Sequence, residues 1–201
     1  MRAHVILFAK QPRLGRVKSR LAKDIGDAKS LSFYRNNLTR VVRRLKGDPR
    51  INLTIAISPD RVASENPAWA FGVPLIRQGH GELGERMARA FRNAPPGPVI
   101  IIGSDIPAIT KPLVLNAIRK LGHADAVFGP SGDGGYWLVG LRRLRPPSYS
   151  LFRSVRWSGP YALKDSKATL TKASVVVLAT CLDDVDDGAS YHRWKAGNRH
   201  D

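Results

Sequence analysis

The segment that most constrains the fold is the stretch at residues 98–107, with the sequence PVIIIGSDIP, which contains four consecutive β-branched apolar residues at 99–102. Its β-branched residues follow neither a helical nor an alternating period, and proline and glycine bound them. A run of this kind is typical of a strand buried on both faces in the middle of a parallel α/β sheet. The small residues Gly103 and Ser104 let the chain turn, and Asp105 then follows at the carboxyl end of the strand. Because open α/β sheets bind ligands at that edge, we expect Asp105 to belong to a binding site.

The rest of the chain alternates predicted strands with predicted helices. Apolar runs favour strands over residues 3–9, 51–57, 73–76, 124–128 and 174–179, with one more starting near Tyr136. Apolar positions at three- and four-residue steps predict helices over residues 28–45, 83–91, 110–121, 161–170 and 189–197, with Thr110 as an N-cap. The alternation predicts a single α/β domain over residues 1–201, Rossmann-like, with a mostly parallel central sheet and helices on both faces.

Composition limits the class of protein. The single cysteine, Cys181, excludes an intrachain disulfide framework and a cysteine-rich zinc site, and it favours a reducing compartment. No stretch approaches about 18 uninterrupted apolar residues, so we expect no membrane span. The apolar run at the start is too short for a signal peptide and leads into Lys10 and Gln11 without a cleavage site. We therefore expect a cytoplasmic protein.

The net charge of +17 predicts an anionic partner or working surface. Nucleic acid, an acidic membrane face and a phosphorylated small molecule all fit that charge. A solvated basic surface accounts equally well for most of the individual cations.

A basic loop follows the first predicted strand and contains Pro12 and Gly15. In this position α/β proteins hold phosphates with backbone N–H groups and cationic side chains. The loop matches neither a P-loop nor a G-x-G-x-x-G sequence. A later glycine-rich segment at residues 78–87 opens a helix, whose N-terminus also attracts anions. The predicted nucleotide- or phosphate-binding residues are Lys10, Arg13, Lys18, Arg20 and Gly84.

Carboxylates follow three of the predicted strands: Asp105, Asp133 within a glycine-rich loop, and the pair Asp184 and Asp186. Mg²⁺ and Mn²⁺ prefer oxygen ligands, and proteins usually hold them with one or two carboxylates and substrate phosphates. Each aspartate alone could instead cap a turn. Together with the basic loop, the carboxylates favour a site for phosphoryl or glycosyl transfer.

Several motifs, in order, resemble an uncharacterised bacterial family with a glycosyltransferase-A-like fold, inferred to be nucleotide-diphospho-sugar transferases. They are FAKQP at residues 8–12, VKSRLA at 17–22, LGERM at 83–87, IGSDIP at 102–107 and GPSGDGGYWL at 129–138, with shorter pieces at 155–158 and 184–186. The segment at residues 18–22 is also similar to the phosphate-binding loop of phospholactate guanylyltransferase. The resemblance runs from residue 4 to about residue 187.

The resemblance implies a nucleotide over the first loop and a divalent cation, Mg²⁺ or Mn²⁺, on Asp105. Ser104 stands where the D-x-D motif of such folds has an acid, so Asp186 is expected to supply the second metal ligand. Asp105 and Asp133 are the predicted catalytic residues, Asp133 binding the acceptor or acting as a base. The predicted acceptor-binding residues are Gly134, Gly135, Tyr136 and Trp157.

The function predicted in this way is a transferase that uses a nucleotide or nucleotide sugar, a divalent metal and an unknown acceptor, and the resemblance implies a glycosyltransferase. One alternative is a nucleotidyltransferase of the guanylyltransferase type. Another is a non-catalytic basic module that binds nucleic acid; the aromatic residues, however, are not interleaved with the cations as single-strand binders require.

Overall fold

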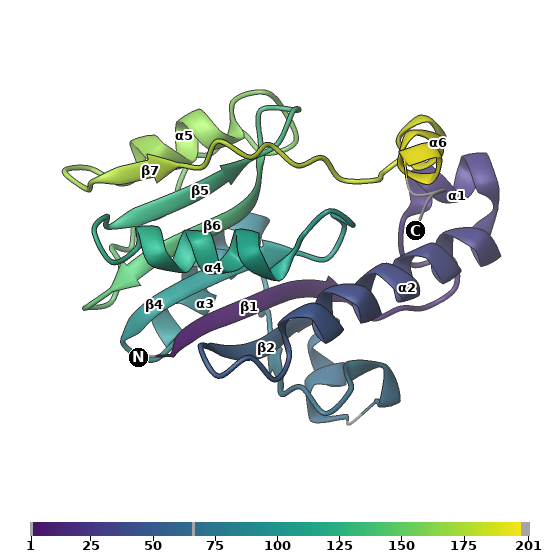
Figure 1. Ribbon diagram of the computed structural model, residues 1–201, viewed down its shortest axis with the longest axis horizontal. Helices are drawn as coiled ribbons and strands as arrows, with labels where there is room; N and C mark the ends of the chain where they lie inside the picture. Colours follow the sequence, from purple (N-terminus) through teal and green to yellow (C-terminus); the bar gives the residue numbers. More distant parts are fainter. Residues whose placement is uncertain (1, 66, 198–201) are drawn as a thin grey trace.

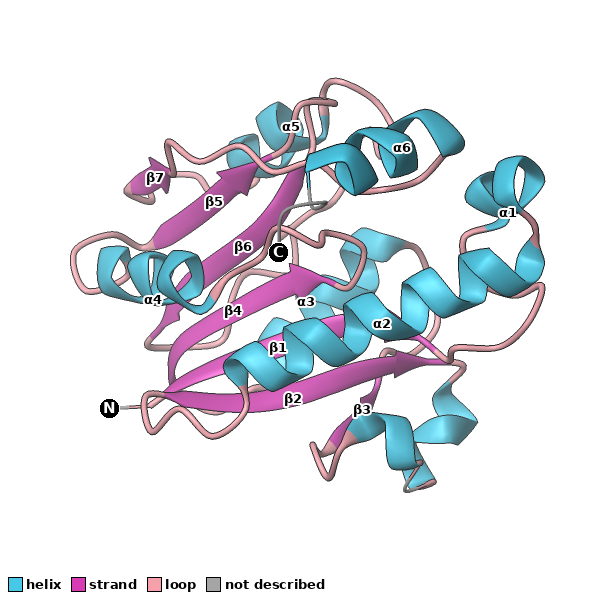
Figure 2. Cartoon of the chain, turned by 45° about the vertical axis from the view of Figure 1, so that its right-hand side comes forward, coloured by secondary structure: helices cyan, strands magenta, loops and turns pink. Residues whose placement is uncertain are grey.

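A computed structural model describes residues 2–65 and 67–197. Within them, the strands form one sheet of order β3-β2-β1-β4-β6-β5-β7. β6 runs antiparallel to both of its neighbours, and the other pairs are parallel. Figure 2 shows the arrowheads of β1, β2, β4 and β5 at one edge of the sheet. The strands are β1 (Ala3–Lys10), β2 (Ile51–Ser58), β3 (Leu75–Arg77), β4 (Gly97–Gly103), β5 (Ala126–Pro130), β6 (Tyr136–Arg143) and β7 (Val175–Val177).

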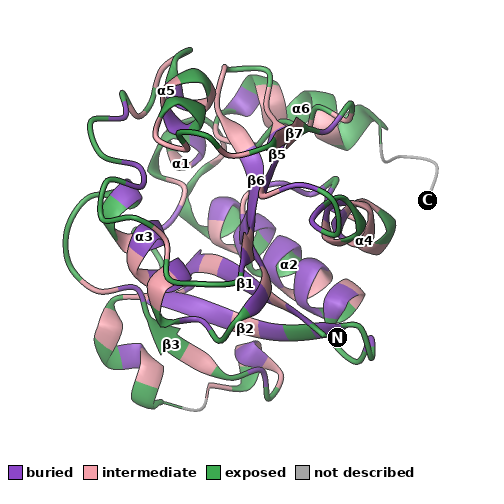
Figure 3. Ribbon diagram, turned by 90° about the vertical axis from the view of Figure 1, so that its left-hand side faces the viewer, coloured by how far each residue is buried: buried purple, intermediate pink, exposed green. Residues whose placement is uncertain are grey.

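Helices cover both faces of this sheet, as the sequence predicts. Seen along the sheet edge, α2 and α4 lie on one face and α3 and α5 on the other (Figure 3). The helices are α1 (Ser19–Ile25), α2 (Asp27–Leu45), α3 (Leu83–Asn93), α4 (Lys111–Lys120), α5 (Ala162–Ala168) and α6 (Gly188–Gly197), with 3₁₀ turns η1 (Asp60–Ser64) and η2 (Ala68–Ala70). In the described part of the chain, no helix is long and apolar enough to cross a membrane.

The apolar residues at 99–102 lie in the central strand β4, between β1 and β6. Ile100 and Ile102 pack into the core on the α2 and α4 face. Val99 and Ile101 pack into the core beneath α3. All four side chains are buried, so this strand is apolar on both faces, as predicted.

Several local details differ from those predicted. α1 already begins at Ser19, inside the segment expected to be a loop. Thr110 is the N-cap residue of α4, but its side chain makes no capping hydrogen bond. β7 and α5 are shorter than predicted, and β3 and β5 begin two residues later than predicted. Periodicity locates an element better than it locates its ends.

The C-terminal strap, residues 178–187, runs from β7 across the carboxyl edge of the sheet to α6 (Figure 1). Its backbone N–H groups at Leu182 and Val185 bond to the carbonyls of Pro130 at 3.1 Å and Asp105 at 3.2 Å. The strap therefore joins the ends of β5 and β4. This crossing brings the aspartates near the C-terminus to Asp105, as the sequence predicts.

α6 packs against α1 and α2 and so holds the C-terminal end of the strap in place. Phe33 of α2 makes edge-to-face contacts with Tyr191 at 5.5 Å and Trp194 at 5.0 Å between ring centroids. The backbone N–H of Gly188 also bonds to the side chain of Asp24 at 2.7 Å. The strap is thus held at both ends, which fixes its acidic residues over the sheet edge.

Candidate active site

Two adjoining cavities lie at the carboxyl ends of β1 and β4, and Phe8, Leu83, Gly103 and Asp105 line both. The cationic lobe, about 420 Å³, lies over the first loop. The apolar lobe, about 290 Å³, lies towards β6 and the segment before α5. Asp105, a predicted site residue, therefore lies where the two lobes meet.

Lys18 joins the two predicted metal carboxylates. Its Nζ lies 3.2 Å from Asp105 Oδ2 and donates to Asp186 Oδ1 at 2.6 Å. The Lys18 side chain is 3% exposed, while those of Asp105 and Asp186 are 41% and 44% exposed. Burial lowers the pKa of Lys18, but the charges of Asp105 and Asp186 outweigh it and raise the pKa above its usual value. The ammonium is therefore fixed between the carboxylates.

Lys18 also adopts a left-handed backbone conformation, with φ 51°, directly before α1. This conformation is uncommon for a residue with a side chain and costs of order 1 kcal/mol or more. The ion pairs offset that cost.

A buried hydrogen-bond network between α2 and the end of β4 orients Asp105. Ser104 Oγ donates to Asp105 Oδ1 at 3.3 Å. Asn37 Nδ2 donates to the Ser104 carbonyl at 2.7 Å. The Tyr34 hydroxyl accepts from the Lys10 N–H at 2.8 Å and lies 3.3 Å from Ser104 Oγ. Burial, and then the charge of Asp105, raises the pKa of Tyr34, which keeps its hydroxyl protonated.

Sequence reasoning missed this network. Tyr34 falls at an apolar position of the predicted helix over residues 28–45, and Ser104 stands out in the sequence only as a small residue in place of the D-x-D acid. The available signal was Asn37, a polar residue on the apolar face of α2 beside Leu38.

The cationic lobe contains Lys10, Arg20 and Arg86 in addition to Lys18. Arg86 was not predicted as a site residue, although it lies in one of the motifs. Its Nη1 donates to Gln78 Oε1 at 2.5 Å, and the Gln78 side chain is buried against β1 and β2. Burial lowers the pKa of Arg86, which nevertheless stays a cation at neutral pH.

Two residues predicted to bind the nucleotide do not line either lobe. Arg13 is exposed on the loop, outside both linings. Gly84 is buried, and a Cβ built there would lie 2.8 Å from the ring of Trp157. The structure thus gives Gly84 a packing role, since only glycine lets α3 approach Trp157. Nucleotide binding by these two residues stays a prediction.

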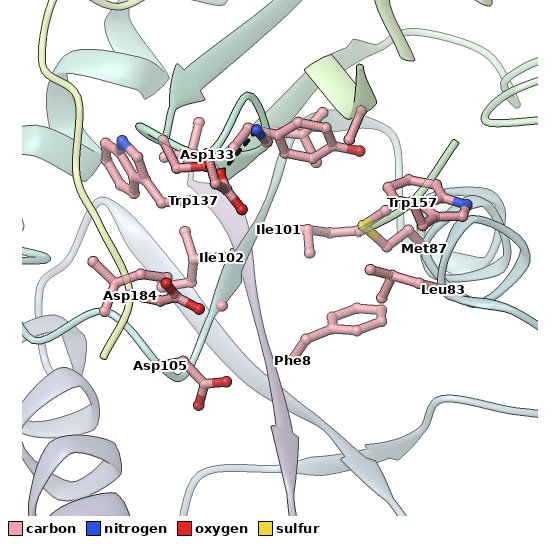
Figure 4. Close-up of a pocket in the computed structure, with 18 of the residues that line it drawn as sticks. Phe8, Leu83, Met87, Ile101, Ile102, Asp105, Asp133, Trp137, Trp157 and Asp184 are labelled. Atoms are coloured by element: carbon pink, nitrogen blue, oxygen red, sulfur yellow. Dashed lines mark hydrogen bonds between the residues drawn. The ribbon is translucent and has the colours of Figure 1, made fainter. Parts of the chain in front are cut away.

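The apolar lobe has two unlike sides (Figure 4). Carboxyl groups lie on one side, and apolar side chains from β1, α3 and the segment before α5 lie on the other. The carboxylates are Asp105, Asp133 and Asp184, and the labelled apolar residues opposite them are Phe8, Leu83, Met87 and Trp157.

Asp184, which the sequence placed among the candidate carboxylates without a role of its own, is an exposed carboxyl at this lobe. Partial burial and then the neighbouring charge of Asp186 raise its pKa to about 6. Within the described residues, its side chain accepts no hydrogen bond and forms no ion pair. It is therefore free to accept a hydrogen bond from a ligand.

The Asp133 side chain caps the turn of its own loop, the alternative role that the sequence leaves open for each of these aspartates. Its Oδ1 accepts from Ser131 Oγ at 2.5 Å and from the Gly135 N–H at 2.9 Å. Gly134 has φ 83°, and a Cβ there would clash with the Pro160 backbone. The glycines thus fold the loop tightly, and Asp133 still lines the apolar lobe.

The predicted acceptor-binding residues divide into two groups. Gly135, Tyr136 and Trp157 line the apolar lobe, and Gly134 does not. The Tyr136 hydroxyl lies 3.1 Å from Ser166 Oγ, and burial raises its pKa. Tyr136 therefore presents its ring to the lobe, with its hydroxyl on Ser166.

The comparison with solved structures finds transferases and nucleotidyltransferases. A "putative nucleotide-diphospho-sugar transferase" from Desulfovibrio desulfuricans G20 is 28% identical with a TM-score of 0.86, covering 99% of this chain and 89% of that one. CMP:2-keto-3-deoxy-manno-octonic acid synthetase complexed with CTP is 14% identical, with a TM-score of 0.62 and 98% of each chain covered.

A third structure is 4-diphosphocytidyl-2C-methyl-D-erythritol synthase from Anaerococcus prevotii DSM 20548. It is 11% identical with a TM-score of 0.64, covering 98% of this chain and 97% of that one. At 14% and 11% identity, these last two structures show only that the fold is shared. No curated protein sequence matches the chain. A family model described as "Uncharacterized protein conserved in bacteria (DUF2064)" matches residues 41–159, more than half of the sequence. The chain therefore belongs to the DUF2064 family.

Proposed function

We propose that the chain is a cytoplasmic, single-domain transferase that moves a sugar from a nucleotide sugar to a small acceptor. One observation carries the proposal: a cationic lobe and an acid-lined apolar lobe meet at Asp105. The likeness to the Desulfovibrio structure, at 28% identity, supports it. The two lobes give a donor and an acceptor separate places that share a boundary.

The cationic lobe suits the diphosphate of the donor. Lys10, Arg20 and Arg86 line it and supply charge-assisted hydrogen-bond donors for phosphate oxygens. Arg86 is already positioned by Gln78, so that little side-chain freedom is lost on binding. Lys18 also lines this lobe, but its ammonium contacts Asp105 and Asp186, so phosphate binding by Lys18 stays a prediction.

The reaction that fits the two lobes is a substitution at the sugar carbon next to the diphosphate. The acceptor hydroxyl oxygen bonds to that carbon, and the bond from the carbon to the diphosphate oxygen breaks. The electron pair leaves on the nucleoside diphosphate, where the lobe's cations stabilise the charge. The hydroxyl proton passes to the free carboxylate of Asp184, while Asp133 holds the glycine loop beside the acceptor.

Metal binding by Asp105 and Asp186 stays a prediction. Their oxygens are the ligand type that Mg²⁺ and Mn²⁺ prefer. In the described arrangement, however, the point where they converge holds Lys18 Nζ. A divalent ion does not fit between them while Lys18 stays there, and we assign the metal no step. Mn²⁺ titration of wild type and Lys18→Met, followed by electron paramagnetic resonance, tests this fit.

Binding of nucleoside diphosphates, measured by calorimetry with and without Mn²⁺, tests the donor site. Wild type should bind at least one of UDP, GDP, CDP, ADP and dTDP. Arg86→Gln should weaken that binding about 10- to 100-fold, because it removes a charged hydrogen-bond donor. Arg119→Gln, an exposed arginine on α4, is the matched control and should change little. Equal losses in both variants, or no binding by wild type, would contradict the proposal.

Nucleotidyl transfer is the second candidate, favoured by the fold shared with the two cytidylyl-transferring synthetases. In that reaction an acceptor oxygen attacks the α-phosphorus of a nucleoside triphosphate and pyrophosphate leaves. The two candidates therefore differ in the released product, which is a nucleoside diphosphate for sugar transfer and pyrophosphate for nucleotidyl transfer.

A further inference from the structure

Among the residues that the structure describes, no cation lines the apolar lobe, although the chain has a net charge of +17. The charged residues in its lining are Asp105, Asp133 and Asp184, all acids. The cations at this sheet edge line the neighbouring lobe instead. A phosphate or carboxylate placed in the apolar lobe would face Asp133 and Asp184, for which the described lining supplies no cation, and Asp105, whose charge Lys18 offsets from the neighbouring lobe.

From this separation of charge we propose that the acceptor is an uncharged alcohol with an apolar or aromatic body, and that phosphorylated and carboxylate acceptors are rejected. That the ligand is an acceptor rests on the proposed function, but the preference of the lobe for an uncharged alcohol does not. The preference also bears on the reaction type, because it disfavours transfer to a phosphate group.

The wall opposite the acids supports an apolar body. Leu83 and Met87 come from α3, and Phe8 comes from β1 (Figure 4). Trp157 completes this wall and packs edge-to-face against Tyr136 at 6.4 Å and Phe152 at 6.3 Å between ring centroids. A wall fixed in this way gives an aromatic ligand a preformed surface, which lowers the entropic cost of binding.

The opposite side supports a hydroxyl group. No donor in the described part of the chain bonds to the Asp184 carboxylate, and Asp105 lies at the boundary with the cationic lobe. A ligand with its ring on Trp157 would therefore direct a hydroxyl towards these carboxylates and the donor (Figure 4). A molecule without a hydrogen-bond donor would leave this side unsatisfied.

The size of the lobe sets a limit on the acceptor. Its volume of about 290 Å³ is at the lower end of ligand pockets, which run from about 300 to 1,000 Å³. The lobe therefore fits a molecule of one or two rings, or the reacting end of a longer one.

The test compares benzyl alcohol with benzyl phosphate, which share the same ring. Binding is followed by NMR at the indole N–H of Trp157, whose signal is assigned with the Trp157→Phe variant. This signal reports binding in the apolar lobe and not phosphate binding in the cationic lobe. Wild type should bind the alcohol about tenfold more tightly or better. Leu83→Arg places a cation at the rim, where Leu83 is 38% exposed, and should raise affinity for benzyl phosphate about tenfold. Leu144→Arg, at a site 69% exposed outside both lobes, should leave both affinities unchanged.

Benzyl phosphate binding as tightly as the alcohol at Trp157 of wild type would overturn the inference, and so would failure of both probes to shift that signal. Nucleoside diphosphate binding is measured on the same samples. If the nucleotide binds and the alcohol does not, this inference alone fails; if the alcohol binds and no nucleotide does, the proposed function fails.

Discussion

Replacing Lys18 by methionine removes the cation that both Asp105 and Asp186 contact. Because both acids touch the same nitrogen, their oxygens lie within about 6 Å of each other, where two like charges at an effective dielectric constant of about 20 repel by about 3 kcal/mol. Lys18 is 3% exposed, but the acids are 41% and 44% exposed, so solvent screens part of this repulsion. We expect Lys18→Met to lower the free energy of unfolding by about 2 kcal/mol, between the values for surface and buried pairs.

Urea denaturation measures this loss. Lys23→Met, at an exposed lysine in the last turn of the same helix, is the matched control and should change the free energy of unfolding by about 0.5 kcal/mol or less. In an Asp105→Asn/Asp186→Asn background, Lys18→Met should no longer destabilise, because no carboxylates remain to repel each other. An equal cost in both backgrounds, or a cost no larger than that of Lys23→Met, would refute the interpretation of Lys18 as the bridge.

Three further predictions concern stability. Gly134→Ala should cost about 1–3 kcal/mol in urea denaturation, because φ is 83° and the new Cβ meets the Pro160 backbone; an unchanged midpoint would show that the loop relaxes freely. Tyr34→Phe should cost about 1–2 kcal/mol, because it leaves buried groups without their hydroxyl partner; thermal unfolding within error of wild type would count against that role. Asp165 has its pKa lowered to about 2 by hydrogen bonds from Arg156. The stability from this pair is present above the ordinary pKa near 3.8 and is lost as pH falls through about 2. Asp165→Asn should therefore remove that part of the acid sensitivity, and acid unfolding curves of the same shape for both proteins would contradict the prediction.

The layout of the fold could be predicted because its determinants are local. The run around Ile100–Ile102 has no polar position, which only a strand buried on both faces tolerates. The apolar positions of α2 recur at three- and four-residue steps, and they are the positions that pack on the sheet. The antiparallel direction of β6 was not predicted, because it depends on the tight loop around Gly134 and on which strands pair across the sheet.

The site could be predicted only in part, because its key contacts join distant segments. Asp105 follows from its position at the end of β4. Lys18 and Asp186 are 168 residues apart, and nothing local indicates that the ammonium bonds to both carboxylates instead of facing a phosphate. Arg86 was missed because its position depends on Gln78, and Asp184 was named only with Asp186 because its place at the apolar lobe depends on the course of the strap. Sequence pattern gives the charge of a loop but not the direction of each side chain.

The measurement that tests the central claim most directly is release of nucleoside diphosphate from a nucleotide sugar in the presence of an acceptor alcohol, followed by ³¹P NMR. Wild type should release nucleoside diphosphate only when the acceptor is present. Asp184→Asn should bind the nucleotide normally in calorimetry and release the product about 100-fold more slowly, as loss of a general base requires. Release of pyrophosphate from a nucleoside triphosphate instead, or an Asp184→Asn variant as fast as wild type, would contradict the account.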